Sequence, residues 1–344
     1  MKEQKTQVKK KFLKKIFIKI CRIFGYEIID QSSFYVPTQK KNLGENLNIP
    51  GKKSITLPLG EVKISRKVSE LTIIFRSCTN INMLTQNKKR LFDQDKSEYT
   101  FRSLNSIITS LNQARITFPK IKFDIVVVDY NSKKKDLEQI KKQLEKSNFK
   151  NSIISLDIKE FINDIKKINA KKENVMDNQI SNMSNIHKSL LIGKNQCNDL
   201  IYFVEDDYLH QQNSINEMIF AYERISSQIN KELILCPTDY PYLYTKIDST
   251  NIFLGANKHW RKIDETLCTF LTSKILLEKY WEKFVSMCQF EHYPFEQPLH
   301  DIYKIEYCLS PIPSLALHCT NVNSIFVLSP NVDWKKIWDE NAVY

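Results

Sequence analysis

The stretch Leu200–Val204 (LIYFV) runs directly into Glu205-Asp206-Asp207-Tyr208. Five apolar residues in a row are typical of a strand buried on both faces. Ligands of open α/β sheets bind beyond the carboxyl ends of the strands, which is where the three acids lie. Adjacent carboxylates repel one another, so the pattern predicts a cation here, and oxygen ligands favour Mg²⁺ or Mn²⁺ bridging two phosphates. The alternative is a solvated acidic turn ahead of a helix expected from Ser214.

Around this stretch, strands and helices are predicted to alternate, which favours a doubly wound, mostly parallel sheet. Upstream, strands are expected at 71–75, 123–129 and 152–156, and helices at 100–114, 135–146 and 185–193. Downstream, strands are expected at 233–236, 251–254 and 266–272, and helices at 214–225 and 274–287. The tail from Ser310 to Tyr344 is expected to be irregular.

The basic charge is concentrated at the N-terminus. The first 22 residues contain nine lysines and arginines and one acid, Glu3, within a net charge of +12 for the chain. Apolar residues from Phe12 to Phe24 recur at helical spacing with lysines between them, which predicts a basic amphipathic helix over 1–25 that binds an anionic membrane surface. The alternative is a terminal helix whose apolar face packs on the domain.

Composition excludes several classes of protein. Six glycines and no GxGxxG or GxxxxGK[ST] motif argue against a glycine cradle for phosphate, so a metal ion or cationic clamp is needed instead. Eight scattered cysteines without a CxxC indicate reduced thiols of a cytosolic protein. No apolar run reaches the roughly 18 residues of a transmembrane helix, and no signal peptide is expected.

Two motifs in order, VVVDYNS at 126–132 and FVEDD at 203–207, resemble GT-A glycosyltransferases, especially the family 2-like group. The resemblance implies that Asp129 binds the nucleoside. Asn131 stands where family members usually have glycine, and asparagine also tolerates a left-handed turn. The segment Ser77-Cys78-Thr79-Asn80 fits the family's first loop, which makes Asn80 a further nucleotide-binding candidate.

The resemblance also assigns roles to the acids. Glu205-Asp206-Asp207 matches the family's DxD element, which implies that Asp207 ligates the metal and that Glu205 or Asp206 reaches the ribose or a second metal position. Some GT-A enzymes use a late histidine as a metal or diphosphate ligand, so His318 is a second metal candidate; the alternative is a buried, hydrogen-bonded histidine.

An inverting transferase needs a base for the acceptor hydroxyl. The family places an acid on the acceptor side, so the candidates are Asp301 and Glu296, with Glu265 third. Asp301 is preferred because a helix over 302–307 is expected to begin after it. A plain helix N-terminal acid is the alternative.

The sequence therefore predicts a GT-A-type α/β fold in three parts: the helix 1–25, a lead-in 26–69, and one domain 70–344 with a nucleotide-sugar half (70–210) and an acceptor half (211–344). The expected function is metal-dependent transfer, by an inverting mechanism, from a nucleotide sugar to a glycan or lipid-linked acceptor in cell-surface polysaccharide synthesis. The expected location is the cytoplasmic, inner face of the membrane, with no nucleic-acid partner. The alternatives are a sugar-phosphate nucleotidyltransferase and a non-catalytic basic protein that binds membrane or nucleic acid.

Overall fold

The computed structural model describes residues 12–13, 16–26, 54–57, 60–80, 90–245, 247 and 249–343. The chain divides into two units, Met1–Leu47 with Ser54–Val62, and Asn48–Lys53 with Lys63–Tyr344. In the first unit, residues 12–13 and 16–23 are helical, and β1 (Ser54–Leu57) pairs with β2 (Gly60–Lys63). The rest of the predicted helix 1–25 and most of the lead-in 26–69 lie outside the described residues. No helix among the described residues combines the length and apolarity needed to cross a membrane.

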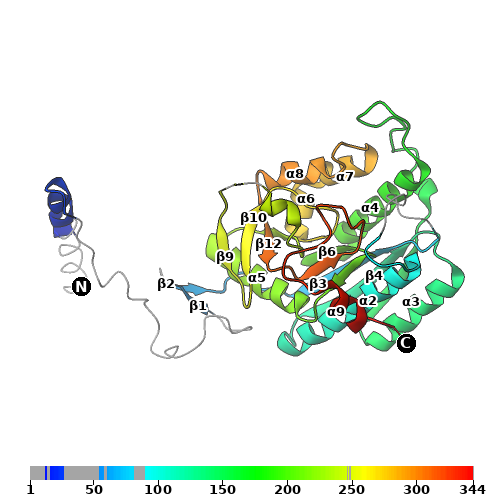
Figure 1. The fold of residues 1–344 in the computed structure, drawn as a ribbon, viewed down its shortest axis with the longest axis horizontal. Helices are drawn as coiled ribbons and strands as arrows, with labels where there is room; N and C mark the ends of the chain where they lie inside the picture. Colours follow the sequence, from blue (N-terminus) through cyan, green and yellow to red (C-terminus); the bar gives the residue numbers. More distant parts are fainter. Residues whose placement is uncertain are drawn as a thin grey trace. The chain divides into compact units, whose positions relative to one another are not determined.

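The second unit is built on a nine-stranded sheet of order β5-β4-β3-β6-β11-β8-β12-β10-β9 (Figure 1). Only β11 and β10 run antiparallel to their neighbours, so seven of the nine strands share one direction. The mostly parallel α/β sheet expected from the sequence is confirmed. The strands are β3 (Glu70–Ser77), β4 (Lys122–Asp129), β5 (Lys150–Ser155), β6 (Leu200–Glu205), β8 (Leu233–Leu235), β9 (Ile252–Leu254), β10 (His259–Ile263), β11 (Phe270–Ser273) and β12 (Tyr307–Ile312).

Apolar side chains alternate between the two faces of the sheet, because successive residues of a strand point to opposite sides. In β3, Ile73 and Phe75 belong to one core cluster and Ile74 to the other. In β6, Tyr202 and Phe203 divide in the same way. Two cores therefore sandwich the sheet, which explains why its central strands are continuous apolar runs.

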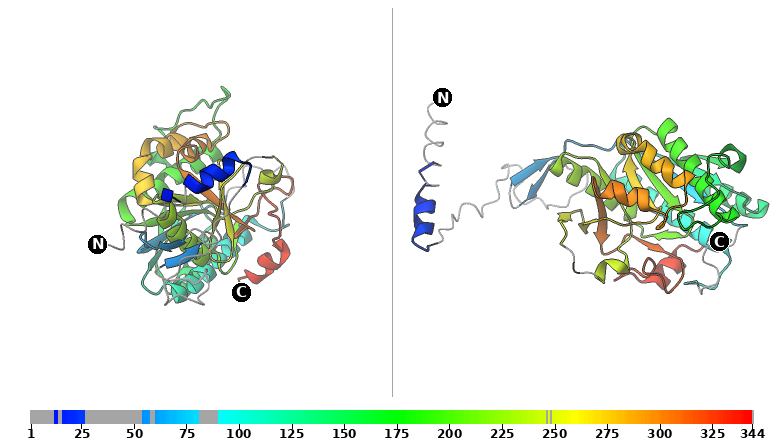
Figure 2. Two further views of the ribbon diagram at one scale, coloured as in Figure 1. Left: turned by 90° about the vertical axis from the view of Figure 1, so that its left-hand side faces the viewer. Right: turned by 90° about the horizontal axis from the view of Figure 1, so that it is seen from above.

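Helices cover both faces (Figures 1 and 2). One side carries α2, α3, α5 and α9, and the other carries α4, α6, α7 and α8. The helices are α2 (Lys96–Thr117), α3 (Lys134–Ser147), α4 (Asp177–Gln196), α5 (Ser214–Ile229), α6 (Lys274–Lys279), α7 (Trp281–Gln289), α8 (Gln297–Tyr303) and α9 (Trp334–Glu340).

Three sequence-based expectations are corrected. The predicted helix 274–287 is two helices that meet at Tyr280. The helix expected over 302–307 is α8, which begins at Gln297 and ends at Tyr303, so Asp301 lies inside it and Glu296 precedes it. The tail is not irregular throughout. It supplies the second half of β12, then β13 (Ala316–His318), which pairs with β7 (Tyr208–His210), and finally α9.

None of the eight cysteines forms a disulfide bond, and six of them are buried. Burial raises the pKa of these six thiols, to about 11 for Cys197 and Cys236.

Candidate functional site

The acidic turn after β6 begins with Glu205, whose carboxylate faces the neighbouring strands. Its Oε1 lies 2.9 Å from Nη2 of Arg76 on β3, and its Oε2 accepts a hydrogen bond of 3.2 Å from the Thr269 hydroxyl. Arg76 also donates to the side-chain oxygen of Asn182 on α4, at 3.0 Å. The Glu205 side chain keeps 27% of its surface exposed, so it remains open to a ligand.

Asp206 points instead to the start of α2. It forms a buried ion pair with Lys96, and its Oδ2 accepts hydrogen bonds from the Thr100 hydroxyl at 2.8 Å and the Cys78 amide at 3.1 Å. Burial disfavours the Lys96 ammonium, but the charges of Asp206 and Asp207 outweigh burial and raise its pKa. Asp206 thus ties the end of β6 to α2 and to the turn after β3.

Asp207 is brought next to His318 by the pairing of β7 with β13. His318 lies opposite Tyr208 in this antiparallel pair, and the Cys319 amide donates to the Asp207 carbonyl at 2.7 Å. The Asp207 Oδ2 and His318 Nε2 atoms are then 3.4 Å apart. Burial alone would raise the pKa of Asp207, but the charge and hydrogen bond of His318 prevail and lower it to about 2. Burial likewise opposes the His318 charge, and Asp207 raises the pKa of His318 despite it.

The His318 ring is fixed in a way that suits a metal ligand. Its Nδ1 lies 3.1 Å from the Phe326 carbonyl, to which an Nδ1–H donates, and its ring stacks on Tyr208 with centroids 4.5 Å apart. Metal-binding histidines characteristically use the second ring nitrogen in this way, leaving the other free to bind the ion. Asp207 and His318 therefore fit a divalent ion as an oxygen and a nitrogen ligand. The described residues contain no group of three or more such side chains, so an ion held here would need other ligands, such as phosphate and water.

Each acid of the turn has its own cation: Arg76 for Glu205, Lys96 for Asp206 and His318 for Asp207. The metal ion was expected because the three carboxylates repel one another. These three side chains of the protein itself relieve that repulsion. The case for a metal rests on the pairing of Asp207 with His318.

Asp129, at the end of β4, organises the next loop along the sheet edge. It accepts hydrogen bonds from the Ser77 hydroxyl at 2.7 Å and from the Ser132 amide at 3.2 Å. Asn131 has a φ of 56°, so it takes the left-handed conformation expected of it. Asn80 is exposed at the end of the turn after β3, and its side chain bonds to none of the described residues.

Glu296 lies at the start of α8 and approaches the acidic turn from the other side. Its Oε1 is 3.9 Å from the sulfur of Cys268, the neighbour of the Thr269 that holds Glu205. Burial, reinforced by the charge of Glu205, raises the pKa of Glu296 to about 7. A carboxyl group with this proton affinity is suited to general acid–base chemistry near neutral pH.

Asp301, the preferred base candidate, lies on the surface of α8. Its carboxylate bonds to Lys304 at 2.8 Å and to Gln297 at 3.0 Å, and 38% of its side chain is exposed. The Lys304 hydrogen bond lowers its pKa. The backbone carbonyl of Glu265 accepts a hydrogen bond from the Tyr242 hydroxyl. The geometry groups Glu296, not Asp301, with the acidic turn.

Sequence reasoning missed Arg76, Lys96 and Thr269. Arg76 had a signal, because a charged residue at the end of an apolar strand needs a partner at the sheet edge. Lys96 and Thr269 lie in stretches without such a pattern, and only the folded chain reveals their contacts.

No family profile matches the chain, and no curated protein matches it. Solved structures do. Galactosyltransferase LgtC with donor and acceptor sugar analogues has 9% identity over 78% of this chain and 94% of its own, with a TM-score of 0.35. An active-site mutant of LgtC is matched over 63% of this chain and 64% of its own, with 10% identity and a TM-score of 0.32.

UDP-glucose pyrophosphorylase with UDP-glucose has 8% identity over 79% of this chain and 98% of its own, with a TM-score of 0.37. Mouse xyloside xylosyltransferase 1 has 12% identity over 68% and 76%, with a TM-score of 0.36. At such scores these neighbours carry no argument about function, which has to come from the site.

Replacing Asp206 with asparagine is expected to destabilise the protein by about 3–5 kcal/mol, because Lys96 is left as an uncompensated buried charge. Urea unfolding followed by circular dichroism measures the loss. The matched control is Asp124→Asn, whose ion pair with the exposed Lys150 is screened by solvent and should contribute little to stability. Equal small losses in both variants would contradict a structural role for Asp206.

Proposed function

We propose that the protein is a metal-dependent glycosyltransferase that moves a sugar from a nucleotide-sugar donor to a glycan or lipid-linked acceptor. The observation that carries the proposal is the pairing of Asp207 with His318 at the carboxyl edge of the sheet. Asp129 on the same edge and Glu296 beside the turn supply the remaining roles.

The donor would lie along the carboxyl ends of β4, β3 and β6. Asp129 and Glu205 stand at the ends of strands on either side of β3, roughly 10 Å apart at two strand spacings. That separation suits a nucleoside at the Asp129 loop and a diphosphate at the acidic turn. Asn80 and Glu205 are further candidates for nucleotide or ribose contacts, whereas the bonds of Asp206 to α2 favour a structural role for it.

A Mn²⁺ or Mg²⁺ ion held by Asp207 and His318 would neutralise the departing diphosphate. Contacts within the protein already hold both proposed ligands, Asp207 and His318, in position. The Cys319 amide holds the Asp207 backbone, and the Phe326 carbonyl and the Tyr208 ring hold His318. Before the ion binds, the proton on His318 compensates Asp207, so loading the metal should release a proton.

Glu296 is proposed as the base that takes the proton from the acceptor hydroxyl. Its raised pKa keeps part of it in the carboxylate form near pH 7 while retaining high proton affinity. An inverting mechanism requires one base on the acceptor side, and Glu296 meets that requirement better than Asp301. In this mechanism the bond between the donor sugar and the diphosphate would break as the acceptor hydroxyl attacks.

The helix over 12–13 and 16–23 is proposed to hold the enzyme at the inner, cytoplasmic face of a membrane. Its apolar side chains Phe17, Ile20 and Ile23 are 46–77% exposed, and Lys19 and Arg22 accompany them. Such a helix binds by burying its apolar face while its cations attract anionic lipid. Lipid-linked acceptors for cell-surface polysaccharide would be met at that surface.

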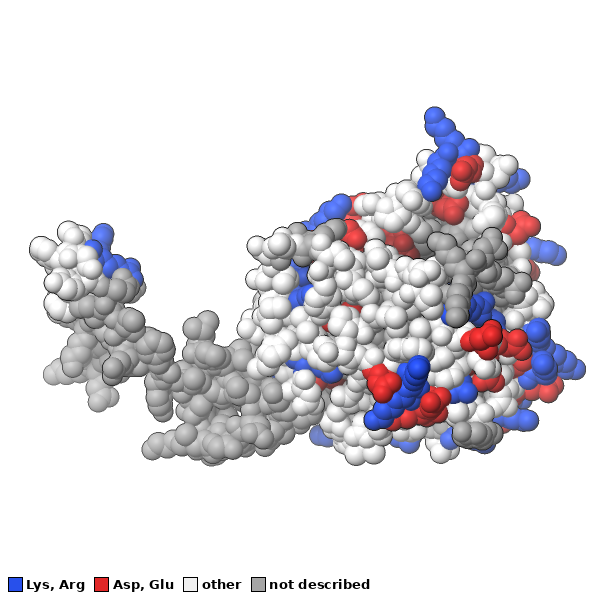
Figure 3. Space-filling model, viewed as in Figure 1, with Lys and Arg blue, Asp and Glu red and all other residues white. Residues whose placement is uncertain are grey.

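Nucleic acid is not the proposed partner. Figure 3 shows lysine and arginine side chains interspersed with aspartate and glutamate over the visible face of the second unit's described residues. Nucleic-acid binding would favour a stripe of one sign of charge.

Nucleoside diphosphates are expected to raise the melting temperature of the protein only when Mn²⁺ or Mg²⁺ is present, because ligands stabilise the state that binds them. Asp207→Asn should abolish this metal-dependent shift while the variant remains folded. Asp124→Asn, far from the turn in sequence and on the surface, should keep it. An unchanged shift in Asp207→Asn would sink the metal assignment. Release of pyrophosphate from a nucleoside triphosphate and a sugar 1-phosphate would point to nucleotidyl transfer instead.

Glu296→Gln is expected to lower turnover by about 10²–10⁴ while donor affinity persists, since a base acts on the chemical step. Wild-type kcat/KM should rise with pH through about 7, because the base works as the carboxylate and its pKa is about 7. Asp301→Asn should keep near-normal turnover. Full activity in Glu296→Gln with loss in Asp301→Asn would reverse the two roles, and activity in both would direct attention to Glu265.

Deletion of residues 1–25 is expected to leave a folded, active enzyme that no longer sediments with phosphatidylserine-containing vesicles. The full chain should sediment less as salt rises, because screening weakens its attraction to anionic lipid. Ile20→Asp in the full chain should reduce sedimentation without changing the number of lysines. Retained sedimentation after the deletion would show that the membrane contact lies elsewhere, and failure to fold would show that the helix belongs to the core.

A further inference from the structure

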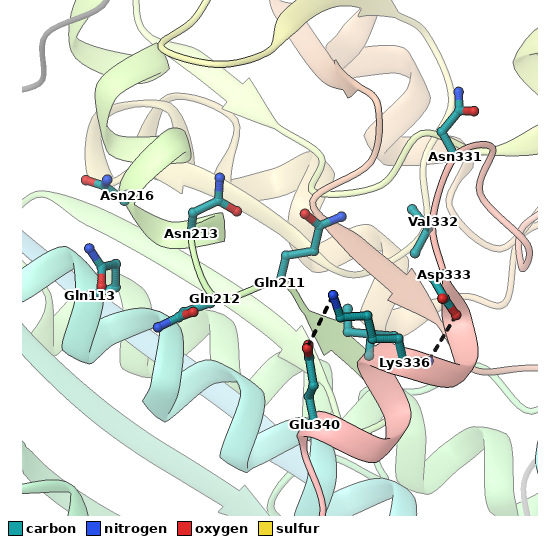
Figure 4. Close-up of a pocket in the computed structure, with 11 residues that line it drawn as sticks. Gln113, Gln211, Gln212, Asn213, Asn216, Asn331, Val332, Asp333, Lys336 and Glu340 are labelled. Carbon is teal, nitrogen blue, oxygen red and sulfur yellow. Dashed lines mark hydrogen bonds and ion pairs between the residues drawn. The ribbon is translucent and has the colours of Figure 1, made fainter.

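A hollow of about 580 Å³ lies where α2, the turn between β7 and α5, and the segment leading into α9 meet (Figure 4). It is separated from the acidic turn by β7, which runs from beside Asp207 to Gln211. Four residues of extended strand span about 13 Å. The hollow is therefore distinct from the proposed diphosphate site, but it is joined to it by one short strand.

Six of the eleven residues that line this hollow carry side-chain amides. Five of them form no hydrogen bond with any described residue: Gln113, Gln212, Asn213, Asn216 and Asn331. The Oδ1 atom of Asn216 is fully buried and lacks a partner among the described residues. Buried polar atoms are nearly always hydrogen-bonded in native proteins, so this oxygen marks a point where the described residues leave a hydrogen bond unmade.

Other polar groups around the hollow are already engaged. The Gln211 amide donates to the Ser314 carbonyl at 2.8 Å, Asp333 accepts from the Lys336 amide at 3.0 Å, and the Lys336 ammonium lies 3.7 Å from Glu340 (Figure 4). The two opposite charges at the rim compensate each other. What remains for a ligand is the negative charge of Asp333 and a set of neutral donors and acceptors, which together select against a phosphate or a nucleotide.

Each amide offers both a carbonyl oxygen and an NH₂ group. A sugar hydroxyl is complementary to this pair, since it donates and accepts at one atom. The hollow also falls within the size of pockets that hold small organic ligands. A neutral ligand dense in hydroxyl groups would form hydrogen bonds with the amide side chains that line the hollow.

We infer that this hollow is a binding subsite for a neutral carbohydrate. This inference rests on the proposed function. In a glycosyltransferase, the hollow would hold sugar units of a glycan acceptor about 13 Å from the point of transfer. It narrows the acceptor class to an oligosaccharide or polysaccharide, because a single sugar cannot occupy both places.

Saturation-transfer NMR on the full chain tests the subsite directly, with neutral hexasaccharides of glucose, galactose or N-acetylglucosamine as probes. At least one hexasaccharide should bind the wild-type protein. Asn216→Leu, which keeps the approximate side-chain volume, should weaken that binding about tenfold by removing the partner of a hydroxyl. Gln212→Ala, at an exposed position, provides a second variant whose folding is not at risk. The matched control is Gln139→Leu, an amide of α3 that lines a different hollow.

Absence of binding by all three hexasaccharides would overturn the subsite. Equal binding by Asn216→Leu, Gln212→Ala and Gln139→Leu would place the sugar elsewhere and also overturn it. Thermal shifts with UDP and Mn²⁺, measured on the same samples, separate this result from the proposed function. A protein that binds hexasaccharide through Asn216 but no nucleotide would retain the subsite and lose the transferase assignment.

Discussion

Three consecutive carboxylates at the end of one buried strand impose the constraint on which this structure depends. Side by side, Glu205, Asp206 and Asp207 would repel one another, and the fold meets this by directing each to a cation from a different part of the chain. The cations come from β3, from the first turn of α2 and from the end of β13. Elements as far apart in sequence as Arg76 and His318 are thereby drawn to one edge of the sheet.

This arrangement divides the turn between support and chemistry. The Asp206 carboxylate is fully engaged by the Lys96 ammonium, the Thr100 hydroxyl and the Cys78 amide. It therefore fixes the position of the turn. Asp207 faces a histidine whose charge depends on a single proton. A divalent ion can take the place of that proton, whereas it would have to break a buried ion pair to reach Asp206. The division explains why one acid suits a ligand role and its neighbour does not.

Much of the sheet could be predicted from the sequence, because strands buried on both faces leave apolar runs such as those in β3, β4 and β6. The left-handed turn at Asn131 was expected because the family resemblance places glycine there and asparagine tolerates the same conformation, and the parallel part of the sheet followed from the alternation of strands and helices. Short strands such as β7 and β13 carry no such pattern, since three residues cannot show a period. Their pairing is set by contacts across more than one hundred positions, and the predicted irregular tail was wrong for that reason. The start of α8 was misplaced because Gln297-Pro298 gives a weaker signal than the acid at Asp301.

Asp207 and His318 were both named as metal ligands from a family resemblance. That they lie close together could be learned only from the folded chain, and their roles stay predictions.

The buried cysteines have a practical consequence. Six thiols sit within the core with raised pKa values, so in the native state they present neither access nor thiolate to an alkylating reagent. Five of them, from Cys197 to Cys308 along the chain, belong to the core on one face of the sheet, and Cys319 lies beside the acidic turn. The molecule thus contains its own set of chemical reporters, and the order in which these sulfurs become labelled would record which parts of the domain open first.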